Sequence, residues 1–391
     1  MRRAAALVAI GLLAACTPAP SPTAPAPITS PTAMAPSPTS TSSASAPSSR
    51  SCATAIVDDL SLAERAGQLV MVGVSSASPS ELAVLKAHKI GSVILLGQHA
   101  DGVSGVRKLT ARLAWKGQKL PLLVAVDQEG GLVQRLKGKG FDTMPSAEVQ
   151  AGWSNAVLRA KATRWGRQLA AAGVTWTLAP VADVVPGTMA ARNRPIGALN
   201  RGYGSSPATV RGKVTAFIRG MSEAGVATSA KHFPGIGRVV GNTDFTAGVK
   251  DTLTTADDPY LLPFEGAVEA NVPSIMVSTV TYTRIDAKKP AVFSAAVVGL
   301  LRSTLHFDGV VISDDLGAAR SMAAVPARQR GIGFVKAGGD IAITVAPARA
   351  TAFVGGIVTA AKGSEVVAGQ VRQAAIRVLT MKIEQGLVPC R

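Results

Sequence analysis

Eight short apolar runs recur along the chain from residue 68 onward, and a segment with helical patterning follows each of them. The runs cover 68–74, 91–97, 122–127, 175–181, 226–232, 274–280, 309–314 and 340–346. Most lack strict alternation of apolar and polar residues, which is typical of parallel strands buried on both faces. The pattern predicts an α/β fold, a single (β/α)8 TIM-type barrel over 52–391. An open doubly wound sheet is the alternative, but no glycine-rich phosphate loop follows the first run.

The first 51 residues differ in composition from the rest. A basic start is followed by an apolar stretch at 4–13 that is too short to span a bilayer. It ends in Leu13-Ala14-Ala15-Cys16, the form of a bacterial lipobox. We therefore predict a lipoprotein signal peptide at 1–15 and a lipid on Cys16 that anchors the protein to the outer face of the cell membrane. An ordinary secretory peptide is the alternative.

Residues 16–51 are almost wholly Pro, Ser, Thr and Ala and carry hardly any charge. A segment of this composition cannot bury enough apolar surface to offset its ordering entropy, so we predict a disordered tether.

The two remaining cysteines, Cys52 and Cys390, stand at opposite ends of the predicted barrel domain. In an exported protein this placement favours a disulfide, with two free thiols as the alternative. For so long a loop the chain-entropy relation gives roughly 6 kcal/mol as an upper limit of stabilisation.

The formal net charge of +17, from 41 basic and 24 acidic residues, belongs mainly to the barrel domain. It favours acidic partners such as anionic lipid headgroups or acidic wall polymers. Nucleic acid is not expected, since no aromatic and basic residues interleave. We expect a monomer.

Charged residues gather where several predicted strands end, and the carboxyl ends of barrel strands meet at one mouth. This set suggests an active site and comprises Asp127, Asp183, Lys231, His232, Asp314 and Asp315. Adjacent strand residues point to opposite faces, so only one of the last two aspartates can face a given substrate atom. Helix capping by the aspartates and a buried core histidine are the plainer interpretations.

Three motifs carry a resemblance to a known family. Residues 127–135 read DQEGGLVQR, residues 231–235 read KHFPG, and residues 307–316 read FDGVVISDDL. With these motifs in this order, the chain resembles the NagZ-type β-N-acetylglucosaminidases of glycoside hydrolase family 3, and more closely their actinobacterial lipoprotein subgroup. The resemblance extends over about 60–379.

The resemblance implies a retaining exo-β-N-acetylglucosaminidase that acts on peptidoglycan fragments or other β-linked amino-sugar glycosides and needs no metal or cofactor. It identifies Asp314 as the nucleophile that forms a glycosyl-aspartate intermediate. The positions that match the family's sugar-binding residues are Asp127, Arg135, Arg201, Lys231 and His232.

One position departs from the family pattern. The family has an Asp-Ser-His triplet, with histidine as the general acid/base, where this chain reads Asn242-Thr243-Asp244. Asp244 can replace the histidine if apolar surroundings or a nearby negative charge raise its pKa. The alternatives are a degenerate member that binds wall glycans without hydrolysing them, or a β-glucosidase. The glycine-rich loop at 237–248 is expected to be mobile and to close over bound sugar.

Overall fold

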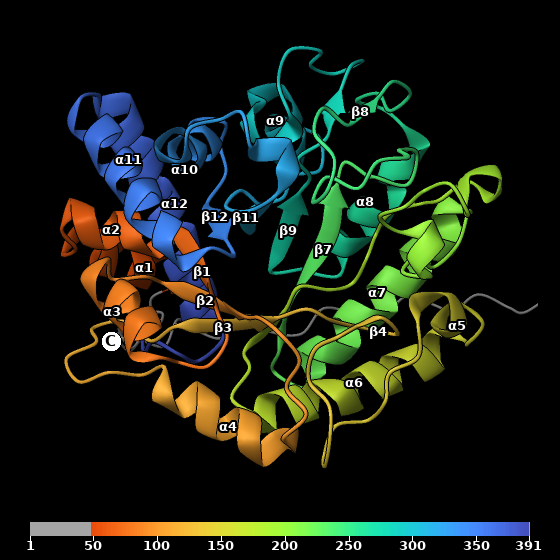
Figure 1. Cartoon of the computed structure of the whole chain (residues 1–391), viewed down its shortest axis with the longest axis horizontal. Coiled ribbons are helices and arrows are strands. Elements are labelled where there is room, and N and C mark those ends of the chain that lie inside the picture. Colours follow the sequence, from red (N-terminus) through yellow and green to blue (C-terminus); the bar gives the residue numbers. More distant parts are fainter. Residues whose placement is uncertain (1–47, 391) are drawn as a thin grey trace, which may run out of the picture. The chain divides into compact units, whose positions relative to one another are not determined.

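Eight parallel strands close into a barrel in the computed structural model, which describes residues 48–390 (Figure 1). Around the barrel the strand order is β1-β12-β11-β9-β7-β6-β3-β2. The prediction of a (β/α)8 barrel is therefore confirmed. The strands are β1 Val70–Val74, β2 Ser92–Leu95, β3 Leu123–Val126, β6 Trp176–Thr177, β7 Ala227–Phe233, β9 Ser274–Val277, β11 Val310–Asp315 and β12 Ile341–Thr344.

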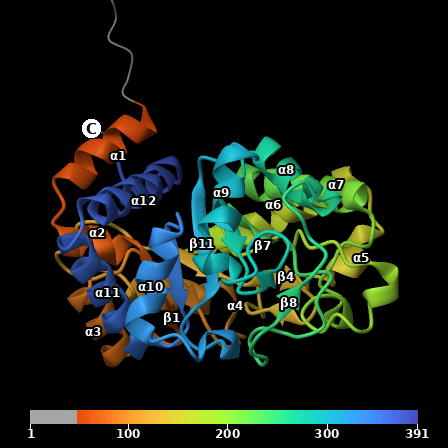
Figure 2. The same cartoon turned by 90° about the horizontal axis from the view of Figure 1, so that it is seen from above.

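Helices follow the strands and lie outside them (Figure 2). Several begin at caps that the sequence provides, such as the capping boxes of Ser61 with Glu64 and of Ser78 with Glu81. They are α2 Leu62–Gln68, α3 Pro79–Ala87, α4 Gly102–Arg112, α5 Ala147–Ala151, α6 Asn155–Ala171, α7 Pro207–Glu223, α8 Leu262–Glu269, α9 Ala295–Ser303, α10 Ala327–Lys336, α11 Ala350–Lys362 and α12 Glu365–Glu384.

The side chains divide into two buried clusters, one between strands and helices and one inside the barrel. Alternate residues of each strand enter the inner cluster, as Val310 and Ile312 of β11 do while Val311 faces the helices. Val378 and Met381 of α12 also pack in the inner cluster. The barrel interior is therefore a packed core made mostly of apolar side chains.

The predicted strand at 175–181 is wrong in length, because β6 contains only two residues. Leu178 donates its N–H to the carbonyl of Val126, and Pro180, two residues further on, has no N–H to donate. The segment stays bonded to β7 beyond Leu178, since Ser229 and Lys231 donate their N–H groups to the carbonyls of Ala179 and Pro180. An isolated bridge then pairs Val181 with Lys231.

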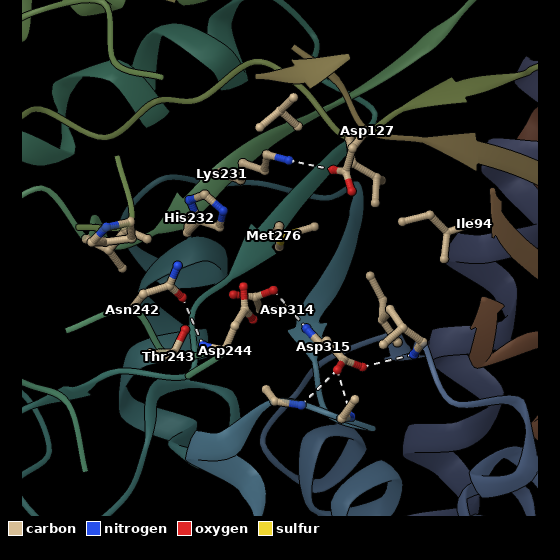
Figure 3. Close-up of a pocket in the computed structure, with 18 of the residues that line it drawn as sticks. Ile94, Asp127, Lys231, His232, Asn242, Thr243, Asp244, Met276, Asp314 and Asp315 are labelled. Carbon is tan, nitrogen blue, oxygen red and sulfur yellow. Dashed lines mark hydrogen bonds and ion pairs between the residues drawn. The ribbon is translucent and has the colours of Figure 1, made fainter. Parts of the chain in front are cut away.

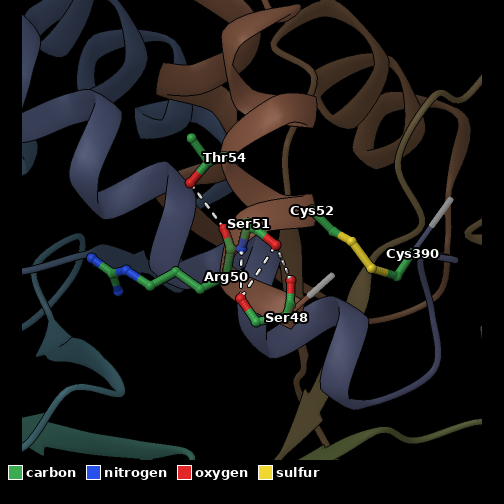
Figure 4. Close-up of a disulfide and its surroundings, with 6 residues drawn as sticks. All are labelled: Ser48, Arg50, Ser51, Cys52, Thr54 and Cys390. Atoms are coloured by element: carbon green, nitrogen blue, oxygen red, sulfur yellow. Dashed lines mark hydrogen bonds between the residues drawn. A yellow bond between two sulfur atoms is a disulfide. The ribbon is translucent and has the colours of Figure 1, made fainter. Parts of the chain in front are cut away.

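Helix α1 (Ser49–Asp58) begins three residues before residue 52, where the domain was expected to start. Ser48 caps it by accepting the N–H of Ser51, and Cys52 is buried in its first half. A disulfide joins Cys52 to Cys390 with a Cα–Cα distance of 5.5 Å (Figure 4).

The predictions for the signal peptide, for Cys16 and for most of the tether lie outside the described residues. Within 48–390, no helix is both long and apolar enough to cross a bilayer.

Two small sheets lie outside the barrel in the described residues. Strands β4 (Gln128–Gly130) and β5 (Val133–Gln134) form an antiparallel hairpin directly after β3. Strands β8 (Lys250–Asp251) and β10 (Thr281–Tyr282) pair in parallel beyond β7 and β9. Both sheets hold loops that leave the carboxyl ends of barrel strands.

Candidate active site

A cavity of about 600 Å³ opens at the carboxyl ends of the barrel strands. All seven side chains predicted to contact or transform a sugar line it: Asp127, Arg135, Arg201, Lys231, His232, Asp244 and Asp314. Figure 3 shows Lys231 with Asp127 on one side of the cavity and Asp244 with Asp314 on another. Residues that lie up to 187 positions apart in the sequence, from Asp127 to Asp314, therefore share one site.

Strand β11 delivers the aspartate pair to the cavity. Asp314 has the same parity as Val310 and Ile312, which face the barrel interior, so its carboxylate is directed into the mouth. One carboxylate oxygen of Asp314 accepts the N–H of Asp315 at 2.8 Å. The other oxygen has no hydrogen bond within residues 48–390, which leaves it available to a substrate.

Asp315 has a structural role. Its two oxygens accept the N–H groups of Gly317, Ala318, Ala319 and Val345 at 2.7–3.0 Å. These four bonds hold the turn after β11 and the end of β12 in place. The capping interpretation therefore applies to Asp315, although its side chain also borders the cavity.

Two cations and two carboxylates form a network at the deep side of the cavity. The Lys231 ammonium contacts Asp127 at 2.8 Å and Glu129 at 2.7 Å. The Arg201 guanidinium donates to both oxygens of Glu129, at 2.7 and 2.8 Å, and to the carbonyl of Pro195. This network fixes the Lys231 and Arg201 side chains before any ligand arrives.

Burial alone would raise the pKa of Glu129, but the adjacent charges of Arg201 and Lys231 hold that pKa well below its usual range. Burial would likewise lower the pKa of Lys231, and Asp127 and Glu129 reverse that effect, so its pKa is raised. Each group therefore keeps its charge inside the protein because its partners lie within hydrogen-bond distance. The result is a rigid, charged surface able to bind hydroxyl groups.

His232 is oriented by a buried aspartate. Its Nδ1 lies 2.8 Å from one oxygen of Asp183, and the other oxygen of Asp183 accepts the N–H groups of His232 and Ile236. Because Nδ1 is engaged, Nε2 is the ring nitrogen left to meet a ligand in the cavity.

Arg135 follows β5 at the rim of the cavity, and the Gln128 side chain accepts its backbone N–H at 3.0 Å. Among residues 48–390, nothing pairs with its guanidinium, so the hairpin presents an uncompensated cation to the cavity.

Asp244 lies on the loop after β7, on the same side of the cavity as Asp314 (Figure 3). The loop is bonded to the turn after β11, since Arg320 and Ser321 donate their backbone N–H groups to the carbonyls of Asp244 and Thr243. Enclosure by the cavity walls, and then the charges of Asp314 and Asp315, raise the pKa of Asp244 to about 6. Asp244 is nevertheless exposed to solvent, so a group at this position can exchange protons with water.

Glu129 and Asp183 support the site, although neither was assigned a catalytic or sugar-binding role from the sequence; Asp183 was predicted only as one of the charged residues at the strand ends. Glu129 stands inside the DQEGGLVQR motif, and Asp183 ends the fourth predicted strand, so both signals were present in the sequence. Each is buried and acts through a neighbour, Glu129 through Arg201 and Lys231 and Asp183 through His232. In residues 48–390, no cluster of His, Cys, Asp and Glu side chains is arranged to hold a metal ion.

A barrel whose mouth carries two neighbouring carboxyl groups and a fixed set of hydrogen-bonding groups has the form of a glycoside hydrolase. Residues 61–381 match the N-terminal domain of glycosyl hydrolase family 3, and the chain belongs to this family. It is a glycoside hydrolase of the β-N-acetylhexosaminidase type.

The chain is similar to proteins named as β-hexosaminidases. The chain is 34% identical over 336 residues to the β-hexosaminidase LpqI of Mycobacterium tuberculosis, which covers 83% of each protein. A β-N-acetylhexosaminidase structure from Beutenbergia cavernae is similar with a TM-score of 0.80 and 43% identity, covering 84% of this chain and 99% of that one. The M. tuberculosis LpqI structure gives a TM-score of 0.76 at 30% identity, covering 88% of this chain and 98% of that one.

Proposed function

We propose that the protein is a retaining exo-β-N-acetylglucosaminidase, with Asp314 as nucleophile and Asp244 as general acid/base. The observation that carries the proposal is the position of Asp244, which lines the same cavity as Asp314 and whose pKa is raised to about 6 by partial burial and by the charges of Asp314 and Asp315. A retaining glycosidase requires one charged and one protonated carboxyl group.

In the first step, the free oxygen of Asp314 attacks the anomeric carbon while the bond to the leaving oxygen breaks. Asp244 gives its proton to that oxygen, so the leaving group departs as an alcohol. In the second step, Asp244 takes a proton from water, whose oxygen attacks the same carbon and displaces Asp314. Two inversions restore the original β configuration.

The sugar ring is held by the remaining side chains of the cavity. Asp127 and Lys231 are joined by an ion pair and present both an acceptor and a donor to neighbouring hydroxyl groups. Arg201 has N–H groups beyond those bound to Glu129 and Pro195, and His232 offers Nε2. Such convergent polar groups suit a ligand made mostly of hydroxyls.

We propose peptidoglycan fragments as the substrates, with β-linked N-acetylglucosamine at the non-reducing end. Their muramic acid and peptide parts carry carboxylates, which a protein of net charge +17 attracts. Arg194 and Arg320, which precede and follow the cavity-lining residues Pro195 and Ala319 in the sequence, add exposed cations whose side chains have no partner within residues 48–390.

A panel of aryl β-glycosides tests this function. We expect release from the N-acetylglucosaminide to exceed release from the glucoside and all other sugars. Preference for the glucoside would replace the proposed sugar, and no release from any member of the panel would favour a glycan-binding protein without activity.

We further propose that the enzyme works at the outer face of the cell membrane, held by a lipid on Cys16. The lipobox form of residues 13–16 supports this. Mass spectrometry of the mature N-terminus should find a lipidated chain that begins at Cys16, and an unmodified chain that begins elsewhere would exclude the anchor.

A further inference from the structure

We infer that Phe245 forms the floor of a leaving-group subsite and stacks on the ring of the sugar that follows the scissile bond. The inference rests on the proposed function, which concerns the sugar that becomes bound to Asp314. It extends that function to the sugar on the leaving-group side of the scissile bond. It predicts that the enzyme prefers a pyranose leaving group over one without a ring.

Phe245 is unusual among the large apolar side chains of the described chain. It is 82% exposed, although aromatic rings of this size are normally buried. It also lines the catalytic cavity, which other strongly exposed apolar residues such as Leu253 do not. An exposed ring at the mouth of a binding cavity indicates a surface that a ligand covers.

The place of Phe245 in the chain fixes which part of the ligand it can meet. It directly follows Asp244, and the general acid must lie beside the leaving oxygen. The network of Asp127, Lys231 and Glu129 occupies the other side of the cavity, where the first sugar is held. The group attached to the leaving oxygen therefore emerges next to Phe245.

The loop that carries Phe245 is held in this position. The backbone N–H of Phe245 donates to the carbonyl of Asn242 at 3.1 Å, and Asp244 is bonded to Arg320 of the turn after β11 at 3.0 Å. Ala318 and Ala319 of that turn also line the cavity, and their side chains are small. One face of a pyranose is composed of C–H groups, which pack against an aromatic ring.

The test compares two substrates that share the first sugar. One is a disaccharide with a second N-acetylhexosamine, and the other is N-acetyl-β-glucosaminyl fluoride, whose leaving group is a single atom. The quantity measured is the ratio of their kcat/KM values. Loss of an apolar contact covering about 60–80 Å² corresponds to roughly 10- to 30-fold, so Phe245→Ala should lower the ratio by about that factor.

The matched control is Leu253→Ala, which removes an exposed apolar side chain from the same region outside the cavity and should keep the wild-type ratio. Phe245→Trp should keep most of the wild-type ratio, because the tryptophan ring can also stack on the sugar. The basic limb of the pH profile should stay in place in Phe245→Ala, which shows that Asp244 is undisturbed.

An unchanged ratio in Phe245→Ala would overturn the inference. So would an equal fall in Leu253→Ala, or a displaced basic limb, because either result would assign Phe245 to loop structure. Wild-type protein that turns over neither substrate would overturn the proposed function, and the subsite with it, whereas wild-type turnover with an unchanged ratio overturns the subsite alone.

Discussion

Replacing Asp244 by alanine should separate substrates according to how much their leaving group needs a proton. A disaccharide leaves as a poor alkoxide and depends on the acid, whereas 2,4-dinitrophenolate leaves unaided. General acid catalysis contributes typically about 10²- to 10⁴-fold, so disaccharide turnover should fall by that factor in Asp244→Ala. The first step with the dinitrophenyl glycoside should remain fast.

The pKa of Asp244 also sets the pH range in which disaccharide turnover depends on this acid. With a pKa of about 6 instead of 3.8, the protonated form of Asp244 is on the order of 100 times more abundant at pH 7. Because the acid must be protonated, kcat/KM for the disaccharide should fall as pH rises through about 6, by about tenfold per pH unit. The dinitrophenyl substrate should lack this basic limb.

The assay follows initial rates for both substrates between pH 4 and pH 8, with and without azide. Azide attacks the glycosyl-enzyme without a general base, so it should restore dinitrophenyl glycoside turnover in Asp244→Ala. Asp257→Ala is the matched control, because Asp257 is an exposed carboxylate outside the cavity. If Asp244→Ala slows both substrates by one modest factor and azide has no effect, Asp244 is a turn residue and the reasoning is refuted.

A 2-fluoro sugar donor should label Asp314 and leave Asp315 unlabelled in peptide mass spectrometry, since only the former has an oxygen free of hydrogen bonds in the described structure. Arg201→Ala should lower the free energy of unfolding by about 3 kcal/mol or more, because Glu129 would be left buried with one partner fewer, and a urea titration measures this. Cys52→Ser should lower it by about 2–4 kcal/mol, visible as a lower Tm that matches the reduced wild-type protein.

The barrel could be predicted because its signal is local. Each buried strand is a run of apolar residues, and every predicted run overlaps a strand of the observed barrel. Alternation along the strand predicted that only one of Asp314 and Asp315 faces a given substrate atom, whereas the choice of Asp314 came from the family resemblance. The length of β6 was missed because the consequence of Pro180 depends on which neighbour the strand pairs with, and the sequence alone does not specify that neighbour.

The side chains that support the site could not be paired with their partners from the sequence. Glu129 meets Arg201 across 72 positions, and Asp183 meets His232 across 49. Such pairs form only when the barrel closes, so no pattern within a short stretch of sequence predicts them. A buried carboxylate in a strand-end motif can equally be a helix cap or a catalytic group, and its partner decides which role it has.

The position of Asp244 also explains how one carboxyl group could serve both halves of the proposed reaction. Its pKa is raised by enclosure and then by the negative charges of Asp314 and Asp315. When Asp314 becomes an ester with the sugar, its charge disappears while the enclosure and Asp315 remain. The pKa of Asp244 must then fall, so the group that donated a proton in the first step becomes the base that removes one from water in the second. A carboxyl can therefore replace the family's histidine here because its acidity follows the state of the nucleophile.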